Sequence, residues 1–274
     1  MADVTAAFSR IFKNAAWKLA PGLCGRIVDR IRGPGPTKVR DSVVIVTGAG
    51  KGIGRAVALA AAGEGAQVVA VARTQADLDS LTAEAGPGIL AVKADVSDRR
   101  ETARVAKLAF EKFSRVDILV NNAGVGYFDA LEKLPPEEID AMVDTNFRGA
   151  VYMARAVAGH MARRGRGAII NVSSVLGFNA RAGESVYAAT KFGLIGFTTA
   201  LAKELKPSGV TVSAVCPGAV DTGFADNRNA AVRADALTAC ETAAEVLGCV
   251  ALGPRIVRVT KNAGRVAREV VNRF

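Results

Sequence analysis

The hydrophobic pattern of the chain switches between two periods from residue 43 onward. Short continuous apolar runs, such as VVIV at 43–46, are typical of strands buried on both faces of a sheet. Between these runs, apolar residues recur at the three- and four-residue spacing of helices. The pattern predicts strands at 43–46, 67–72, 89–94, 116–124, 167–174, 210–218 and 255–260, and helices at 55–63, 77–85, 100–113, 137–159, 187–205 and 238–252.

Strands that alternate with helices predict a particular fold class. Two strands joined through a helix run parallel, because a parallel pair needs a long crossover connection. We therefore expect an α/β fold of the Rossmann type, a doubly wound parallel β-sheet with helices on both faces. The chain of 274 residues is long enough to form this sheet as a single domain, which we assign to residues 37–274.

The first 36 residues are predicted to be a separate extension. The motif GPGP at 33–36 is a linker signal, since glycine and proline interrupt helices and strands. Before it, apolar residues repeat at helical spacing beside lysine and arginine, which predicts a basic amphipathic helix. Its apolar positions are Phe8, Ile11, Phe12, Ala15, Ala16 and Leu19. A second basic amphipathic helix is predicted at 262–274.

The net charge of +10 is concentrated at the two ends of the chain. Residues 1–40 carry +6 and residues 253–274 carry +5, which leaves −1 for the residues between them. A near-neutral body argues against a nucleic-acid-binding protein, which needs a basic stripe on its folded face. The basic ends have the composition of helices that lie on an anionic membrane, so peripheral membrane contact is one interpretation. Docking of the helices on the domain or on a neighbouring subunit is a second, and a removed transit peptide is a third.

Cysteine usage and hydropathy indicate a cytoplasmic protein. The four cysteines, Cys24, Cys216, Cys240 and Cys249, form no CxxC pair, which favours reduced thiols over disulfides or metal ligands. No apolar run approaches the ~18–20 residues needed to cross a bilayer.

A glycine-rich turn follows the first predicted strand. In TGAGKGIG, the glycines Gly48, Gly52 and Gly54, spaced as G-x3-G-x-G, lie between a buried strand and a helix. Glycines at this place let the backbone approach a pyrophosphate, which then meets the free N–H groups at the helix N-terminus. The position of the turn therefore predicts a dinucleotide site.

The residues after the second strand favour NADP(H) over NAD(H). An NAD site usually has an acidic residue there for the ribose 2′-hydroxyl. Here Arg73 follows Ala72, and the next acidic residue is Asp77. Arg73 and Lys51 are cations suited to a 2′-phosphate, although the alternative is that both are solvated surface cations.

Proton transfer is predicted to depend on a tyrosine. The chain has one histidine, His160, which we interpret as an exposed residue at a helix end without a catalytic part. Tyr187 and Lys191 are four residues apart on a predicted helix and therefore share a face. A nearby ammonium group favours phenolate and lowers the pKa of the tyrosine, which suits it to act as acid in reduction and base in oxidation.

From about Ser42 to about Thr222, the chain resembles the short-chain dehydrogenase/reductase family. The motifs that carry this resemblance are TGAGKGIG, ADV at 94–96, NNAG at 121–124, the asparagine of NFRG, NVSS at 171–174, YAATK at 187–191 and PGAVDT at 217–222. They occur in the family's order over about two-thirds of the chain. The N-terminal extension and the segment from about residue 228 depart from the family pattern.

The resemblance implies a set of catalytic residues, Asn146, Ser174, Tyr187 and Lys191. Ser174 would donate a hydrogen bond to the carbonyl oxygen as it gains charge. Lys191 would also hold the nicotinamide ribose, and Asn146 would hold a water that links Lys191 to solvent. No metal is needed.

The resemblance also implies the cofactor site. Asp95 would face the adenine amine, and Thr222 would lie near the nicotinamide carboxamide. The expected cofactor-binding residues are Gly48, Lys51, Gly52, Ile53, Gly54, Arg73, Asp95, Val96, Asn122, Ala123, Gly124, Tyr187, Lys191, Pro217, Gly218, Val220 and Thr222.

These features predict an NADP(H)-dependent oxidoreductase that transfers a hydride between the nicotinamide and a carbonyl or secondary alcohol. The alternative is a dinucleotide-binding scaffold or sensor without turnover. A lipophilic small-molecule substrate suits the mostly apolar residues expected to line the pocket, Val125, Tyr127, Phe128, Val175, Leu176, Phe178 and Phe224. Family members are usually dimers or tetramers, so we expect a homodimer or homotetramer.

Overall fold

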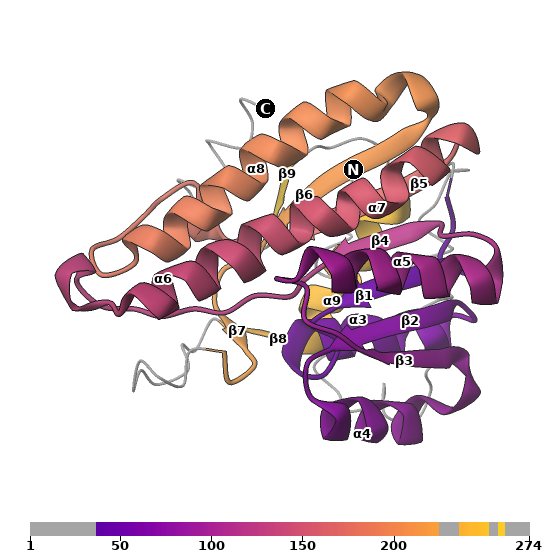
Figure 1. The fold of residues 1–274 in the computed structure, drawn as a ribbon, viewed down its shortest axis with the longest axis horizontal. Coiled ribbons are helices and arrows are strands. Elements are labelled where there is room, and N and C mark those ends of the chain that lie inside the picture. The colour runs from indigo at the N-terminus through magenta and orange to yellow at the C-terminus, as the bar shows by residue number, and fades with distance from the viewer. Residues whose placement is uncertain (1–36, 225–235, 252–256, 261–274) are drawn as a thin grey trace, which may run out of the picture.

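A computed structural model of the chain describes residues 37–224, 236–251 and 257–260. In these residues a single central sheet is covered by helices on both sides (Figure 1). The predicted linker at 33–36, the N-terminal amphipathic helix and the C-terminal basic helix at 262–274 lie outside the described residues.

The central sheet has seven strands in the order β3-β2-β1-β4-β5-β6-β9, and every neighbouring pair is parallel. The chain builds outward from β1 in one direction and then from β4 in the other, so the sheet is doubly wound. This confirms the predicted fold class. The strands are β1 (Val43–Thr47), β2 (Gln67–Ala72), β3 (Ile89–Lys93), β4 (Ile118–Asn121), β5 (Gly167–Val172), β6 (Val210–Cys216) and β9 (Val257–Val259).

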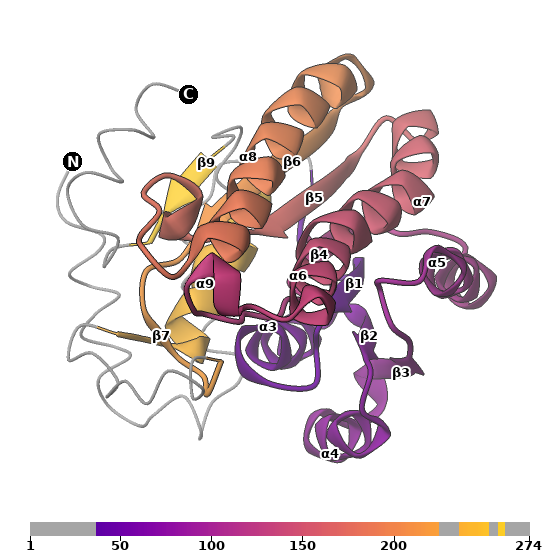
Figure 2. The ribbon, with the colours of Figure 1, turned by 60° about the vertical axis from the view of Figure 1, so that its left-hand side comes forward.

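Helices cover both faces because successive side chains of a strand point to opposite sides. On β1, Val44 and Val46 pack with helices α3, α4 and α9, whereas Ile45 packs in the opposite layer with α5, α7 and α8. Figure 2 shows α3 and α9 on one side of the sheet and α5, α7 and α8 on the other. The helices named here are α3 (Gly52–Gly63), α4 (Gln75–Ala85), α5 (Arg99–Phe113), α7 (Gly149–Arg163), α8 (Ser185–Leu205) and α9 (Ala239–Ala251).

The long helix predicted at 137–159 is interrupted. Helix α6 (Pro136–Val143) is followed by a π turn at Asp144–Arg148, and α7 continues from there. A π turn closes a wider ring than an α-helical turn and redirects the side chains it contains. Asn146 lies in this turn and is 1% exposed, so the interruption buries a predicted catalytic residue.

Two short strands were not expected from the sequence. β7 (Val220–Asp221) and β8 (Leu237–Thr238) pair in parallel as a separate sheet, and the backbone N–H of Leu237 donates to the carbonyl of Ala219 at 2.9 Å. They connect the loop after β6 to the start of α9. The predicted final strand is confirmed as β9, which pairs with β6.

The expectation that His160 is exposed is wrong. Its ring is half-buried and lies 4.5 Å from the ring of Phe110 on α5. Burial, together with Arg164 and Arg163, lowers the pKa of His160. The residue therefore contributes to packing between α5 and α7.

Among the described residues, Cys216, Cys240 and Cys249 form no disulfide, and Cys216 and Cys249 are buried. In the part of the chain that the structure describes, no helix is both long and apolar enough to cross a membrane.

Candidate active site

The glycine-rich turn has the geometry that its sequence predicts. Gly48 and Gly52 have φ of +65° and +55°, values that side-chain-bearing residues rarely adopt. A Cβ at Gly54 would collide with the carbonyl oxygen of Gly48, so α3 packs directly on the turn. No side chain caps the N-terminus of α3 at Lys51, and its first turn contains no acidic residue. Its first N–H groups, which no side chain caps, and its positive helix end therefore fit a pyrophosphate.

The NNAG segment is fixed to this turn through Thr47 at the end of β1. Thr47 Oγ1 accepts from the backbone N–H groups of Asn122 and Ala123, both at 3.0 Å. Asn122 Nδ2 donates to the carbonyl of Thr47 at 3.0 Å. Thr47 was absent from the sequence-based site. The signal for it was a single polar residue between an apolar strand and the glycine turn.

Asn146 joins the π turn to the loop after β4. Its Oδ1 accepts from the N–H of Val125 at 2.7 Å, and its Nδ2 donates to the carbonyl of the same residue at 2.8 Å. A Cβ placed on Gly124 would lie 3.2 Å from Asn146 Oδ1 and 3.7 Å from Lys191 Nζ. The structure thus brings NNAG, Asn146 and Lys191 to one point.

Lys191 is a buried cation on α8. Its side chain is 4% exposed, and Nζ donates to the carbonyl of Val172 at 3.0 Å. Burial lowers the pKa of Lys191 to about 8, and Cys216 acts in the opposite direction. Burial also raises the pKa of the Cys216 thiol to about 12, so this neighbour is uncharged near neutral pH. The Lys191 ammonium is 5.6 Å from the centre of the Tyr187 ring.

The two serines of NVSS differ in role. Ser173 is buried, and its hydroxyl donates to the backbone carbonyl of Lys191 at 3.0 Å, which ties α8 to the end of β5. Ser174 Oγ accepts from the N–H of Leu176 at 3.1 Å and caps a short 3-10 turn at Val175–Gly177. Within the described residues, the Ser174 hydroxyl donates no hydrogen bond. Its proton is therefore available to a substrate carbonyl oxygen.

Aromatic side chains surround Tyr187, which is 7% exposed. The Phe128 ring lies 5.3 Å from the Tyr187 ring in an edge-on arrangement, and the Phe224 ring lies 6.0 Å away. Of the other residues expected to line the pocket, Val125, Tyr127 and Leu176 belong to the same apolar cluster. Phe178 does not belong to it, since it packs instead against Ile195, Ala214 and Cys216.

The loop after β6 reaches two parts of the predicted site. The carbonyl of Pro217 accepts from the N–H of Val175 at 2.9 Å, and the N–H of Gly218 donates to Thr260 Oγ1 at 3.1 Å. A Cβ on Gly52 would lie 3.1 Å from the Cβ of Thr222, so this loop meets the glycine turn. Thr260, just after β9, had no signal in the sequence.

The remaining predicted cofactor residues lie at the start of α3, just after β2 and β3, and in β7. Lys51 Nζ is 3.6 Å from Asp77 Oδ1, and Arg73 Nη1 is 4.0 Å from Asp95 Oδ2. Asp95 Oδ1 also accepts from the N–H and hydroxyl of Ser97 at 2.9 and 2.8 Å. Val96 is buried, and Val220 is the first residue of β7. Ile53 packs against the core between the sheet and helices α3, α4 and α9.

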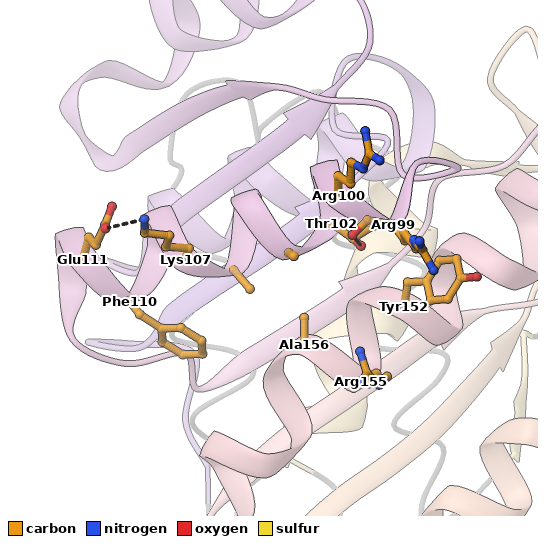
Figure 3. Close-up of a pocket in the computed structure, with 11 residues that line it drawn as sticks. Arg99, Arg100, Thr102, Lys107, Phe110, Glu111, Tyr152, Arg155 and Ala156 are labelled. Atoms are coloured by element: carbon orange, nitrogen blue, oxygen red, sulfur yellow. Dashed lines mark hydrogen bonds and ion pairs between the residues drawn. The ribbon is translucent and has the colours of Figure 1, made fainter.

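A separate groove of about 790 Å³ lies between α5 and α7 and contains none of the predicted site residues (Figure 3). Arg99, Arg100, Tyr152 and Arg155 are among its lining residues. Among the residues that the structure describes, no group of three or more potential metal ligands occurs.

Comparison with protein families gives a match over most of the chain. A family model described as short chain dehydrogenase matches residues 42–233. A 3-oxoacyl-[acyl-carrier-protein] reductase of Synechocystis sp. is 40% identical over 198 residues, which cover 71% of this chain and 80% of that protein. The corresponding reductase of Thermotoga maritima is 36% identical over 204 residues, 73% of this chain and 83% of that protein.

Solved structures match in fold. The crystal structure of levodione reductase is similar with a TM-score of 0.77 and 29% identity, over 82% of this chain and 99% of that one. A 3-ketoacyl-(acyl-carrier-protein) reductase from Brucella melitensis, complexed with NADH, is similar with a TM-score of 0.74 and 33% identity. That match covers 81% of this chain and 98% of the other.

Proposed function

Because the chain belongs to the short-chain dehydrogenase family, we propose that it is an NADP(H)-preferring oxidoreductase of carbonyl compounds and secondary alcohols. The observation that carries the proposal is the convergence of Lys191 and Asn146 at Gly124, beside the ring of Tyr187. This group lies at the carboxyl ends of β4 and β5, where ligands of doubly wound sheets bind.

A bound nicotinamide cofactor supplies or accepts the hydride. Tyr187 donates a proton to the carbonyl oxygen in reduction and takes it back in oxidation. The Lys191 ammonium stabilises the phenolate form of Tyr187, and it does so strongly because little solvent screens a buried charge. Ser174 donates its hydroxyl proton to the same oxygen as charge develops there.

Asn146 acts mainly through position in this mechanism. Both ends of its amide are bonded to the backbone of Val125, and Nδ2 lies 3.3 Å from Thr190 Oγ1. These bonds hold the π turn against α8 next to Lys191. A water held by Asn146 is the group that would return protons to Lys191 from solvent.

The proposed preference for NADP(H) rests on Lys51 and Arg73, whose side chains are 79% and 61% exposed beside the glycine turn and the end of β2. The proposed lipophilic substrate rests on Phe128, Phe224 and the apolar cluster around Tyr187. The relatives named as 3-oxoacyl-[acyl-carrier-protein] reductases support a substrate with a ketone.

The test is cofactor oxidation by the purified protein with NADPH and with NADH, over a panel of 3-oxoacyl thioesters, apolar ketones and free sugars. We expect turnover of an apolar ketone or thioester, faster with NADPH. Tyr187→Phe keeps the ring and deletes the proton, so turnover should fall by at least about 100-fold, the lower end of what positioned proton transfer contributes.

NADPH binding by Tyr187→Phe, followed by fluorescence titration, should stay within about threefold of the unaltered protein, because the phenyl ring remains in place. Ordinary turnover by this variant would overturn the mechanism. Tight NADPH binding without turnover of any substrate in the panel would favour a scaffold or sensor instead.

A further inference from the structure

We propose that Asp77 limits the discrimination of this site between a 2′-phosphate and a 2′-hydroxyl, so that NAD(H) remains a usable cofactor. The inference rests on the cofactor site of the proposed function. An NAD site usually has its acidic residue directly at the end of the second strand. Asp77 lies further along the chain, and its position in the sequence did not place it in the predicted cofactor site.

The fold brings Asp77 back to the glycine turn. Asp77 lies in the first turn of α4, five residues beyond the end of β2. A Cβ placed on Gly50 would lie 2.9 Å from the Cβ of Asp77 and 3.3 Å from the Cβ of Ala72. The carboxylate therefore lies where the glycine turn and the end of β2 meet. In this fold class the adenosine ribose of the cofactor binds at that place.

The cations that favour a 2′-phosphate are not alone at this place. Lys51 is 3.6 Å from Asp77, and Arg73 is 4.0 Å from Asp95, so the four side chains have no net charge. A phosphate monoester carries about −1.5 to −2 near neutral pH. It gains from the two cations but is repelled by the two carboxylates.

The two carboxylates differ in what they can do for a ligand. Asp95 Oδ1 already accepts two bonds from Ser97 within its own loop. In the described part of the chain, the Asp77 carboxylate has Lys51 as its ion-pair partner and accepts no hydrogen bond, although its side chain is only 23% exposed. Ionised carboxylates are acceptors only, so unused Asp77 oxygens suit ribose hydroxyls and disfavour phosphate oxygens.

The substitution Asp77→Asn removes the negative charge while preserving the shape of the side chain. It should release Lys51 for a phosphate and remove the repulsion, both in favour of NADP(H). Asp79→Asn is the matched control, since Asp79 lies on the same helix, loses the same charge, and its carboxylate accepts a hydrogen bond from the exposed Gln75.

The experiment measures Kd for NADP⁺ and NAD⁺ by calorimetry on the full-length protein at low salt, with both variants. We expect the ratio of NADP⁺ to NAD⁺ affinity to rise by about tenfold in Asp77→Asn and to stay unchanged in Asp79→Asn. The rise should shrink at high salt, because these charges are partly exposed. Thermal unfolding of each variant establishes that it is folded.

Two failures are distinguishable. If the unaltered protein binds NAD⁺ more tightly than NADP⁺, the proposed cofactor preference is wrong. The role of Asp77 is still tested, because the change in the affinity ratio between Asp77→Asn and the unaltered protein does not depend on that preference. If the ratio in Asp77→Asn equals that of Asp79→Asn, or falls below that of the unaltered protein, the role of Asp77 is overturned.

Discussion

The proposed chemistry requires the ammonium group of Lys191, but burying this charge destabilises the folded protein. Its side chain is 4% exposed, with the carbonyl of Val172 as hydrogen-bond acceptor. Burial lowers its pKa from 10.5 to about 8, which corresponds to about 3 kcal/mol of destabilisation while the lysine is charged. Activity and stability therefore conflict at this residue.

We predict that Lys191→Met is inactive yet more stable than the unaltered protein below pH 8. The folded pKa is lower than the unfolded pKa, so the unfolded chain binds more protons between about pH 8 and 10.5. The stability of the unaltered protein, relative to Lys191→Met, should thus rise with pH over this range. Urea unfolding at pH 7 and pH 9.5 without cofactor measures the difference.

The advantage of Lys191→Met should be up to about 3 kcal/mol at pH 7 and clearly smaller at pH 9.5. Lys203→Met on the exposed face of the same helix should show no such pH dependence. A constant difference at both pH values would mean that packing, and not the buried charge, accounts for it.

At the scale of elements, the site depends on how closely α3 follows the glycine turn. Gly54 is buried in the first turn of α3 against the carbonyl of Gly48 and the side chain of Asn122. Any Cβ there would push the helix away from the turn and disturb the NNAG segment bonded to Thr47. Local packing and cofactor geometry are therefore coupled.

We predict that Gly54→Ala destabilises the protein by about 1–3 kcal/mol, as overpacking does, and weakens NADPH binding by more than tenfold. Gly196→Ala is the control, since a Cβ at this helical position of α8 meets no atom within 4 Å. That variant should gain about 0.5–1 kcal/mol, because alanine favours helix over glycine. Denaturant unfolding and fluorescence titration measure both, and equal effects of the two variants would contradict the packing argument.

Elements with a local signal were predictable from the sequence, and elements set by distant contacts were not. Apolar patterning located every strand of the main sheet, and the signal is strongest where burial on both faces leaves a continuous apolar run, as in β1. The π turn had no such signal, since it is stabilised by bonds between Asn146 and Val125 of another segment. His160 was misjudged for the same reason, because its contact is with Phe110 on a different helix.

The same distinction holds within the site. Motif spacing was enough to select Tyr187 and Lys191, which share one helix. It did not reveal Thr47 or Thr260 as anchors, nor the approach of Asp77 to Gly50, because these depend on how elements meet. Residues that supply chemistry were therefore easier to predict than residues that hold them.

At the scale of the whole molecule, charge is separated between a near-neutral body and basic ends. Residues 1–36 alone carry a net charge of +4 out of the total of +10. Basic residues near an anionic membrane contribute about 1 kcal/mol each, and salt screens this attraction. The proposed lipophilic substrate would make contact with a membrane useful.

Charge predicts that the full-length protein co-sediments with phosphatidylserine-containing vesicles at low salt and is released at high salt. Deletion of residues 1–36 should reduce the bound fraction, since it removes four net positive charges. Vesicles of neutral lipid are the control. Protein that stays in the supernatant at low salt, or a deletion without effect, would favour the interpretation that the ends dock on protein.

In genetic terms, the π turn at Asp144–Arg148 differs from a continuous α-helix by one inserted residue, which is one codon. One residue turns an α-helix by about 100°, so deleting one position there would rotate α6 relative to α7. Met142 on α6 would leave the cluster around Tyr187, and Asn146 would lose Val125, while the sheet would keep its strands. A one-codon deletion in this segment is thus expected to impair the site while the sheet still folds.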